Sequence, residues 1–233
     1  MTISKGQAWG WQGALEAPGR LAASDASLAA LVGQAVLAGQ PPAPVGLSGG
    51  DLYRTLGGDT ASRHPSDPDA WHYPIDALVV RTTAGGERRD PRVAVAHVIG
   101  FAAPPGGRTR RAATAALRAR GSSALVRAPW FVDETLVAAN AAFVADWNVA
   151  PRGHPNDGRL DATRGALPTR DRRQLAGRLV AGTHVPHPGL ATSRTASLEA
   201  GPGPWRLFID GADAGLVDDF DVRVIPDAIT VVV

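Results

Sequence analysis

The chain has 233 residues, of which 44% are apolar and 20% charged, a composition that excludes wholesale disorder and fits one large domain or a medium domain with a small one. It contains no cysteine, which excludes disulfides and thiolate metal sites. The formal net charge is +2, and 27 glycines and 19 prolines predict frequent turns and short helices.

No segment approaches the ~20 consecutive apolar residues of a spanning helix. The first residues, MTISKGQAWGWQG, lack the apolar core of a signal peptide. We therefore expect a cytoplasmic protein without a membrane span. The basic segment RTRRAATAALRAR at 108–120 fits either a phosphate- or membrane-binding face or a solvated helix surface. Few aromatic residues lie among the arginines, so we expect no nucleic-acid partner.

The sequence of the N-terminal part predicts a helix, a strand and a second, shorter helix. Apolar residues at helical spacing follow Ser24 and Asp25, either of which could cap a helix that extends to Leu37. Prolines end that helix, and a short apolar strand at 44–47 follows them. The strand leads through a glycine turn into a helix that ends before Gly57.

The sequence of the rest of the chain predicts mainly strands. A polar, proline-rich loop at 59–74 precedes them, and helices are expected at 109–120 and 169–180. The expected strands are 75–80, 92–101, 136–144, 192–199, 205–210, 220–225 and 229–233. Strands without regularly alternating helices favour a sandwich over a doubly wound sheet. The predicted fold class is α+β, mainly β. It comprises an antiparallel β-sandwich with peripheral helices at 61–233 and a small α/β unit at 1–60.

The order of several short motifs resembles a known family. The segment VAANAAFVADWNVAPRGHPNDGRLD is followed by Gly182-Thr183-His184, then by Asp210-Gly211-Ala212, and finally by VRVIPDAITVVV. Upstream, VGLSGGDLYRTLGG precedes Ile75-Asp76 by roughly twenty residues. In this order and spacing, over about residues 45–233, the chain resembles the bacterial lipid kinases, which include diacylglycerol and sphingosine kinases. The resemblance implies a kinase's nucleotide-binding domain that is truncated here, followed by the family's β-rich domain.

The resemblance also implies site residues. Phosphorylation of a lipid hydroxyl requires ATP, Mg²⁺ and a base that takes the hydroxyl proton. By position, Asp210 matches the family's base, and Asp157 and Asp161 match an acidic turn that holds magnesium in some relatives. The implied nucleotide-binding residues are Gly49, Gly50, Asp51 and Arg54. From the residues alone, Asp210-Gly211 and Asn156-Asp157-Gly158 are equally typical of ordinary hairpin turns.

The departures from the family pattern leave two functions open. The family's Gly-Gly-Asp-Gly-Thr loop, whose backbone amides cradle the nucleotide phosphates, has no match in the sequence. The family's Asp-Gly-Glu turn ends here in Ala212. One reading is a lipid- or partner-binding module with weak or no kinase activity. The alternative is a kinase subunit whose nucleotide-binding half comes from another polypeptide. A homodimer across uncovered sheet edges is also expected.

Overall fold

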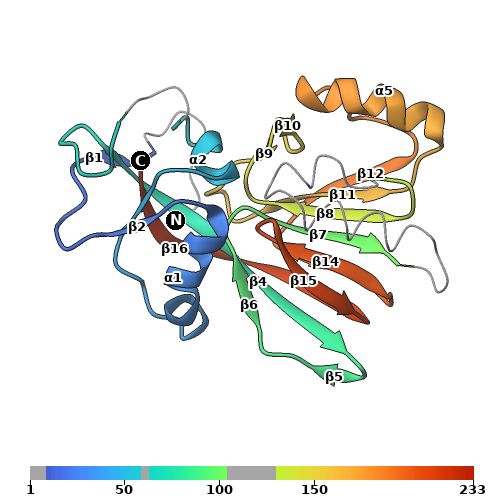
Figure 1. The fold of residues 1–233 in the computed structure, drawn as a ribbon, viewed down its shortest axis with the longest axis horizontal. Helices are drawn as coiled ribbons and strands as arrows, with labels where there is room; N and C mark the ends of the chain where they lie inside the picture. The colour runs from blue at the N-terminus through green and yellow to red at the C-terminus, as the bar shows by residue number, and fades with distance from the viewer. Residues whose placement is uncertain (1–8, 59–62, 104–129) are drawn as a thin grey trace.

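The structure is a computed structural model, and it describes residues 9–58, 63–103 and 130–233. The fold is mainly β, as predicted, with two large sheets, a small hairpin and three described helices (Figure 1). The helices are α1 (Asp25–Leu37), α2 (Asp51–Thr55) and α5 (Thr169–Val180). These confirm three of the predicted helices, whereas the one expected at 109–120 lies outside the described residues.

The first sheet has eight strands and combines both parts of the chain. Its main order is β1-β4-β16-β3-β2, while β5 and β6 pair with β4 and β13 pairs with β16. The strands are β1 (Trp11–Gln12), β2 (Arg20–Ala22), β3 (Val45–Leu47), β4 (Trp71–Ala84), β5 (Glu87–Arg88), β6 (Arg92–Ala94), β13 (Ser197–Glu199) and β16 (Asp219–Val232). The pairs β16–β3 and β2–β3 are parallel, and the other pairs are antiparallel.

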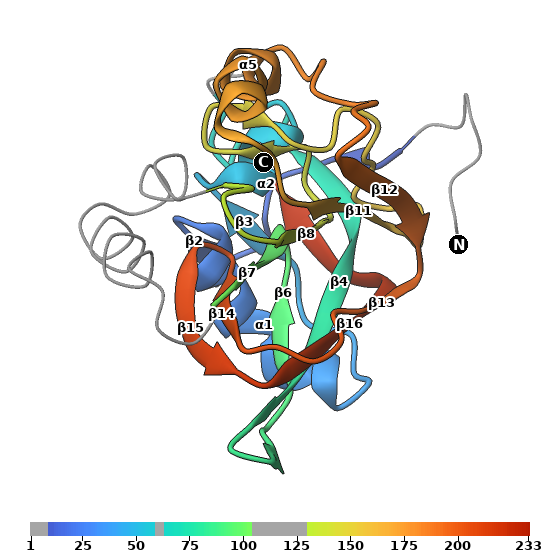
Figure 2. The same ribbon diagram turned by 90° about the vertical axis from the view of Figure 1, so that its right-hand side faces the viewer.

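The second sheet has six strands, all antiparallel, in the order β12-β11-β8-β7-β14-β15. Its strands are β7 (His97–Ala102), β8 (Thr135–Ala139), β11 (Leu160–Gly165), β12 (Leu190–Thr195), β14 (Trp205–Ile209) and β15 (Ala212–Val217). Beside it, β9 (Phe143–Val144) and β10 (Trp147–Asn148) form the small hairpin. Figure 2 shows the two sheets from the side of this second sheet.

Alternating side chains divide the interior into three apolar clusters, because successive residues of a strand point to opposite faces. On β4, Ile75 and Val79 face the cluster beneath α1, whereas Leu78 faces the second sheet. On β8, Leu136 faces the first sheet, whereas Val137 faces the cluster that includes α5. The result is a sandwich of two sheets with α1 and α2 outside the first and α5 outside the second (Figure 1).

The helix ends follow local sequence rules. Ser24 is the N-cap of α1, and its Oγ accepts a hydrogen bond from the N–H of Ser27, whose own Oγ accepts one from the N–H of Ser24. This reciprocal pair is a capping box, and it settles which of the two predicted capping residues acts. On α5, Leu175 and Leu179 lie on one buried side, as the four-residue spacing requires.

Several predicted strands have different bounds in the structure. The strand expected at 136–144 is β8 and β9, which belong to different sheets, and the strand expected at 192–199 is β12 of the second sheet and β13 of the first. The sequence predicts no strand at the positions of β11 and β15. The strand expected at 92–101 is divided at Val95 and Ala96, because the N–H groups of these residues donate to the carboxylate of Asp210 and not to a neighbouring strand. The two strands expected after residue 219 form one long strand, β16. A bulge between Ile225 and Ile229 carries the chain past Pro226 without ending the pairing with β4.

Among the described helices, none is long and apolar enough to cross a membrane.

Candidate functional site

Four buried ionisable side chains meet where the parallel strands β2 and β3 end. Asp25 begins α1 directly after β2, and Asp51 begins α2 after β3. His97 begins β7, and Asp210 lies in the turn between β14 and β15. Their exposed fractions are 5% for Asp25, 6% for Asp51, 1% for His97 and 9% for Asp210. We call these four residues the acidic cluster.

Asp25 joins the two helices of the N-terminal part. Its two carboxylate oxygens accept hydrogen bonds from the N–H groups of Asp51, at 2.6 Å, and of Leu52, at 3.1 Å. These are the first amides of α2, which have no partner within the helix. Gly50 allows this approach: its φ is +104°, and a Cβ at that position would lie 2.5 Å from Asp25 Oδ1. The carboxylate therefore takes the place that an external anion would need at this helix end.

Asp51 connects this corner to the second sheet. Its Oδ2 lies 2.8 Å from His97 Nε2, and its Oδ1 accepts a hydrogen bond of 2.7 Å from the N–H of Ala145. Single ligand atoms of Asp25, Asp51 and His97 lie within 4.8 Å of one another. Spacing of that kind could suit a metal ion, but both oxygens of each carboxylate already have a partner within the protein. We therefore assign no metal to the cluster.

Asp210, the expected catalytic base, holds the backbone in place. Its carboxylate accepts hydrogen bonds of 2.9 to 3.0 Å from the N–H groups of Val95, Ala96 and His97. Asp210 has a φ of +47°, as expected for an aspartate in a tight turn. With three amide donors and little exposure, this carboxylate fixes the bend between β6 and β7.

Burial and mutual repulsion shift the ionisation of the cluster. Burial, with repulsion from Asp210, raises the pKa of Asp25 to about 7. Burial also raises the pKa of Asp210, although His97 and the three amides oppose the shift. For His97, burial lowers the pKa, but the hydrogen bond to Asp51 and the surrounding carboxylates outweigh it and leave it raised. The cluster therefore retains protons that exposed carboxyls would release.

The other expected nucleotide-binding residues support packing. A Cβ on Gly49 would lie 2.7 Å from the carbonyl oxygen of Ala23, so this glycine lets the loop before α1 approach closely. The Arg54 guanidinium lies 4.5 Å from the ring centroid of Phe143 and donates to the Ala145 carbonyl. It also pairs with Asp146 at 3.3 Å. Of the four expected residues, the structure brings Asp51 alone into the acidic cluster.

The expected magnesium residues, Asp157 and Asp161, share an arginine. Arg194 Nη2 pairs with the carboxylate of Asp157, and Arg194 Nε lies 3.5 Å from Asp161 Oδ1. The β11–β12 register places Asp161 directly opposite Arg194. Because a guanidinium already compensates both carboxylates, the residues present do not fit a magnesium ion, and no step is assigned to one here.

A fourth buried carboxylate, that of Asp76, holds three distant segments together. Its oxygens accept hydrogen bonds from the N–H of Gly158, at 2.7 Å, and from the N–H of Asp227 in the bulge of β16, at 2.9 Å. Burial raises its pKa to about 6. Asn140 donates its side-chain amide to the carbonyl of Asp76 and to that of Val95. The Asn140 and Ile75-Asp76 motifs of the sequence therefore meet in one structural junction.

Asp25 and His97 are the members of the cluster that sequence reasoning missed as site residues. The sequence predicts only a possible helix cap for Asp25, and it places His97 within an expected strand. A usable signal for Asp25 is its place between an apolar strand and the start of a helix, within the segment Ala23-Ser24-Asp25-Ala26-Ser27. His97 has no such local signal, because its partner Asp51 is 46 residues away.

Among the comparisons with known proteins, only the comparison of structures finds a match to this chain. No protein-family model matches the sequence. No curated protein matches it. Three solved structures assigned as diacylglycerol kinases from Bacillus anthracis str. Sterne superpose with TM-scores of 0.50, 0.50 and 0.51 and sequence identities of 11%, 10% and 10%. Each match covers 82% of this chain and 69% of the other chain. The chain therefore has a diacylglycerol-kinase-like fold.

Proposed function

We propose that this chain is a lipid-kinase-like binding module that does not transfer phosphate from ATP. The observation that carries the proposal is the hydrogen bonding of Asp25, whose carboxylate accepts from the first two amides of α2. Amides at a helix start are the donors that would otherwise be available to a phosphate. An anionic side chain in that place competes with a triphosphate for the same donors.

The segment 23–27 supports the same proposal. We infer that Ala-Ser-Asp-Ala-Ser is the counterpart of the family's Gly-Gly-Asp-Gly-Thr loop, because it follows a strand, starts a helix and keeps the aspartate and a hydroxyl residue. Each glycine is replaced by a residue with a side chain. Ser24 also occupies the N–H of Ser27 through the capping box, which leaves fewer amides for a phosphate.

Asp210 is poorly placed to act as a base in this arrangement. A general base must reach the hydroxyl whose proton it takes. The three amides that bind the Asp210 carboxylate compete with a substrate hydroxyl for its oxygens, and the turn carries Ala212 where the family has a glutamate. The role that remains for the fold is to bind a lipid or a protein partner.

The test combines ATP titration with a vesicle assay. We expect no heat of binding with millimolar Mg-ATP, and no transfer of radiolabel to diacylglycerol. We expect the chain to cosediment more with phosphatidylcholine vesicles containing diacylglycerol than with phosphatidylcholine alone. Micromolar affinity for ATP, or lipid phosphorylation that is lost in Asp210→Asn, would overturn the non-catalytic role. Equal cosedimentation with both vesicles would exclude diacylglycerol as the ligand.

One observation favours a second candidate, a kinase subunit completed by another polypeptide or a second copy. Strand β2 is the outermost strand at its end of the first sheet in the described residues, and Leu21 on it is 51% exposed. An open strand edge with an apolar side chain is suited to pairing with another chain. Sedimentation analysis that finds a self-associated species, lost in Leu21→Lys, would support this edge as an interface. A monomer at high concentration would exclude the second copy.

A further inference from the structure

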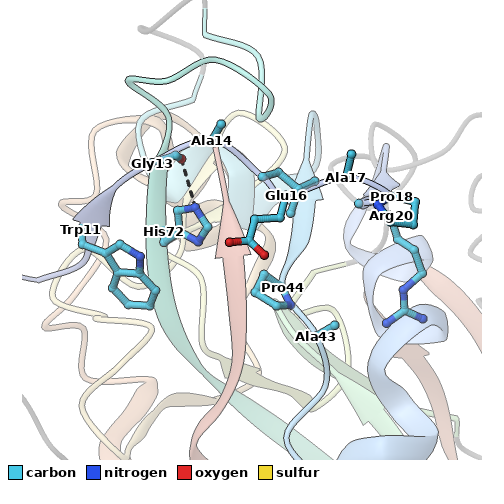
Figure 3. Close-up of a pocket in the computed structure, with 12 residues that line it drawn as sticks. Trp11, Gly13, Ala14, Glu16, Ala17, Pro18, Arg20, Ala43, Pro44 and His72 are labelled. Atoms are coloured by element: carbon cyan, nitrogen blue, oxygen red, sulfur yellow. Dashed lines mark hydrogen bonds between the residues drawn. The ribbon is translucent and has the colours of Figure 1, made fainter.

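A pocket lies at the opposite end of the β2–β3 pair from the acidic cluster. The chain from Trp11 to Arg20 arches over the first sheet, and the pocket of about 570 Å³ lies beneath this arch (Figure 3). Ala43 and Pro44, which precede β3, complete its wall. The acidic cluster follows the same two strands at their other ends, so this pocket is independent of the function proposed above.

The arch is fixed to the sheet by backbone pairing. Strand β1 pairs with the start of β4, the N–H of Gly13 donates to the Ala70 carbonyl, and the N–H of Leu15 donates to the Pro65 carbonyl. These bonds hold the arch on one side of the pocket, and the pairing of Arg20 with Val45 holds it on the other. The pocket is therefore a built feature of the fold and not a gap beside a loose loop.

His72 lines this pocket and carries an unsatisfied acceptor. The imidazole is 8% exposed, and its Nε2 lies 3.0 Å from the carbonyl oxygen of Gly13. Since a carbonyl can only accept, Nε2 carries the proton, and in the neutral ring Nδ1 is an acceptor. Nδ1 is buried and has no hydrogen-bond partner. A buried acceptor without a donor is costly, so the site favours a ligand that supplies one.

Glu16 contributes a carboxylate to the pocket, and Trp11 contributes an aromatic surface. Glu16 and His72 point toward one another across the pocket in Figure 3, and no described cation pairs with Glu16. Trp11 stacks on His72 with ring centroids 5.2 Å apart and is itself 52% exposed, which provides an aromatic wall. Arg20 extends away from Glu16 and donates to the Leu31 carbonyl of α1.

We propose that this pocket binds a small primary ammonium ion, such as an alkylamine, an amino alcohol or the headgroup of an aminolipid. The ammonium would donate one hydrogen bond to Glu16 and another to His72 Nδ1, while its alkyl chain lies against Trp11. An anion is disfavoured, because the Glu16 carboxylate repels it and Nδ1 offers it no proton. Two of the three N–H donors of a primary ammonium would meet these two acceptors, and the third would remain for solvent.

The experiment is calorimetric titration with ethanolamine hydrochloride at pH 8 and low salt. We expect a dissociation constant in the millimolar range, and an affinity about tenfold or more weaker in Glu16→Gln, because a charge-assisted hydrogen bond is lost. Glu16 is exposed, so this variant should fold. The matched control is Glu87→Gln on the distant β5, with a side chain 79% exposed, which should bind as the unchanged protein does.

Three results would overturn the proposal. They are no binding of ethanolamine, unchanged affinity in Glu16→Gln, and an affinity for tetramethylammonium equal to that for ethanolamine. The last result would mean that N–H donors are not recognised. A vesicle arm identifies the source of the amine. Cosedimentation with phosphatidylcholine vesicles that depends on added phosphatidylethanolamine and on Glu16 would indicate a lipid headgroup. Binding of ethanolamine without such cosedimentation would indicate a soluble amine.

Discussion

Two groups of carboxylates contain residues that the family resemblance marks as functional, and the protein compensates their charge in different ways. In the acidic cluster, Asp25 and Asp210 are buried, and backbone amides of the protein satisfy them. In the pair formed by Asp157 and Asp161, a single arginine on the next strand supplies the opposite charge. The first arrangement links distant segments and depends on exact positions, whereas in the second a partly exposed arginine pairs with two half-buried carboxylates. Substitutions in the two groups should therefore differ in how much they change the free energy of unfolding and in how that change depends on pH.

The largest expected effect concerns the pH dependence of stability. The folded-state pKa of Asp25 is about 7 and its ordinary value is 3.8, so between these values the folded protein binds more protons than the unfolded chain. The free energy of unfolding should therefore fall as pH rises from about 4 to about 7. The difference in pKa corresponds to about 4 kcal/mol.

Urea unfolding at a series of pH values measures this slope, and Asp25→Asn, which cannot titrate, should reduce it. Asp76, with a pKa raised to about 6, contributes in the same direction, so part of the slope should persist in that variant. A stability that rises over this range in the unchanged protein, or a slope that is equal in both proteins, would contradict the prediction.

The second effect concerns the three amides that Asp210 binds. Asp210→Ala leaves the N–H groups of 95–97 without their acceptor, and we expect a loss of about 3 kcal/mol in the free energy of unfolding. Asp213→Ala, in the same hairpin, removes a carboxylate paired with Arg206 nearer the surface and should cost about 1 kcal/mol or less. Chemical denaturation compares the two, and similar losses would show that the buried hydrogen bonds matter little.

The third effect concerns the close approach of Asp25 to α2. Gly50→Ala places a Cβ within 2.5 Å of Asp25 Oδ1 at a φ of +104°, so it should cost about 2 kcal/mol or more. Gly215→Ala is the control, because its φ is +95° and no atom lies within 4 Å of its added Cβ. It should cost about 1 kcal/mol, through the backbone alone. Equal losses of thermal stability would mean that the two helices do not need to be this close.

The smallest effect is expected at Arg194, the partner of Asp157 and Asp161. Arg194→Ala should change the free energy of unfolding by about 1 kcal/mol or less, similar to Arg81→Ala, which breaks an exposed pair with Asp221. Millimolar Mg²⁺ should not change the melting temperature of the unchanged protein, because Arg194 already pairs with Asp157 and Asp161. A clear rise in melting temperature with Mg²⁺, lost in Asp161→Asn, would show that the ion displaces the arginine.

Local sequence determined much of this fold. Ser24 and the apolar spacing after it specified α1, the prolines from Pro41 specified its end, and apolar segments between turn residues specified many strands, although not β11 or β15. These features depend on neighbours within a few residues, which the sequence displays directly. The strand bounds near Val95 could not be predicted, because the donors there turn to Asp210, more than a hundred residues away.

The candidate sites required the tertiary structure. The motifs predicted that Asp51 and Asp210 have a role, but only strand order and register bring them to Asp25 and His97, and only burial raises the pKa of Asp25. The same register places Arg194 opposite Asp161, which turns an expected metal site into an ion pair. Partners that are distant in sequence leave no local pattern, and desolvation depends on everything that packs around a group. The sequence therefore determined the elements, and their packing determined which side chains can act together.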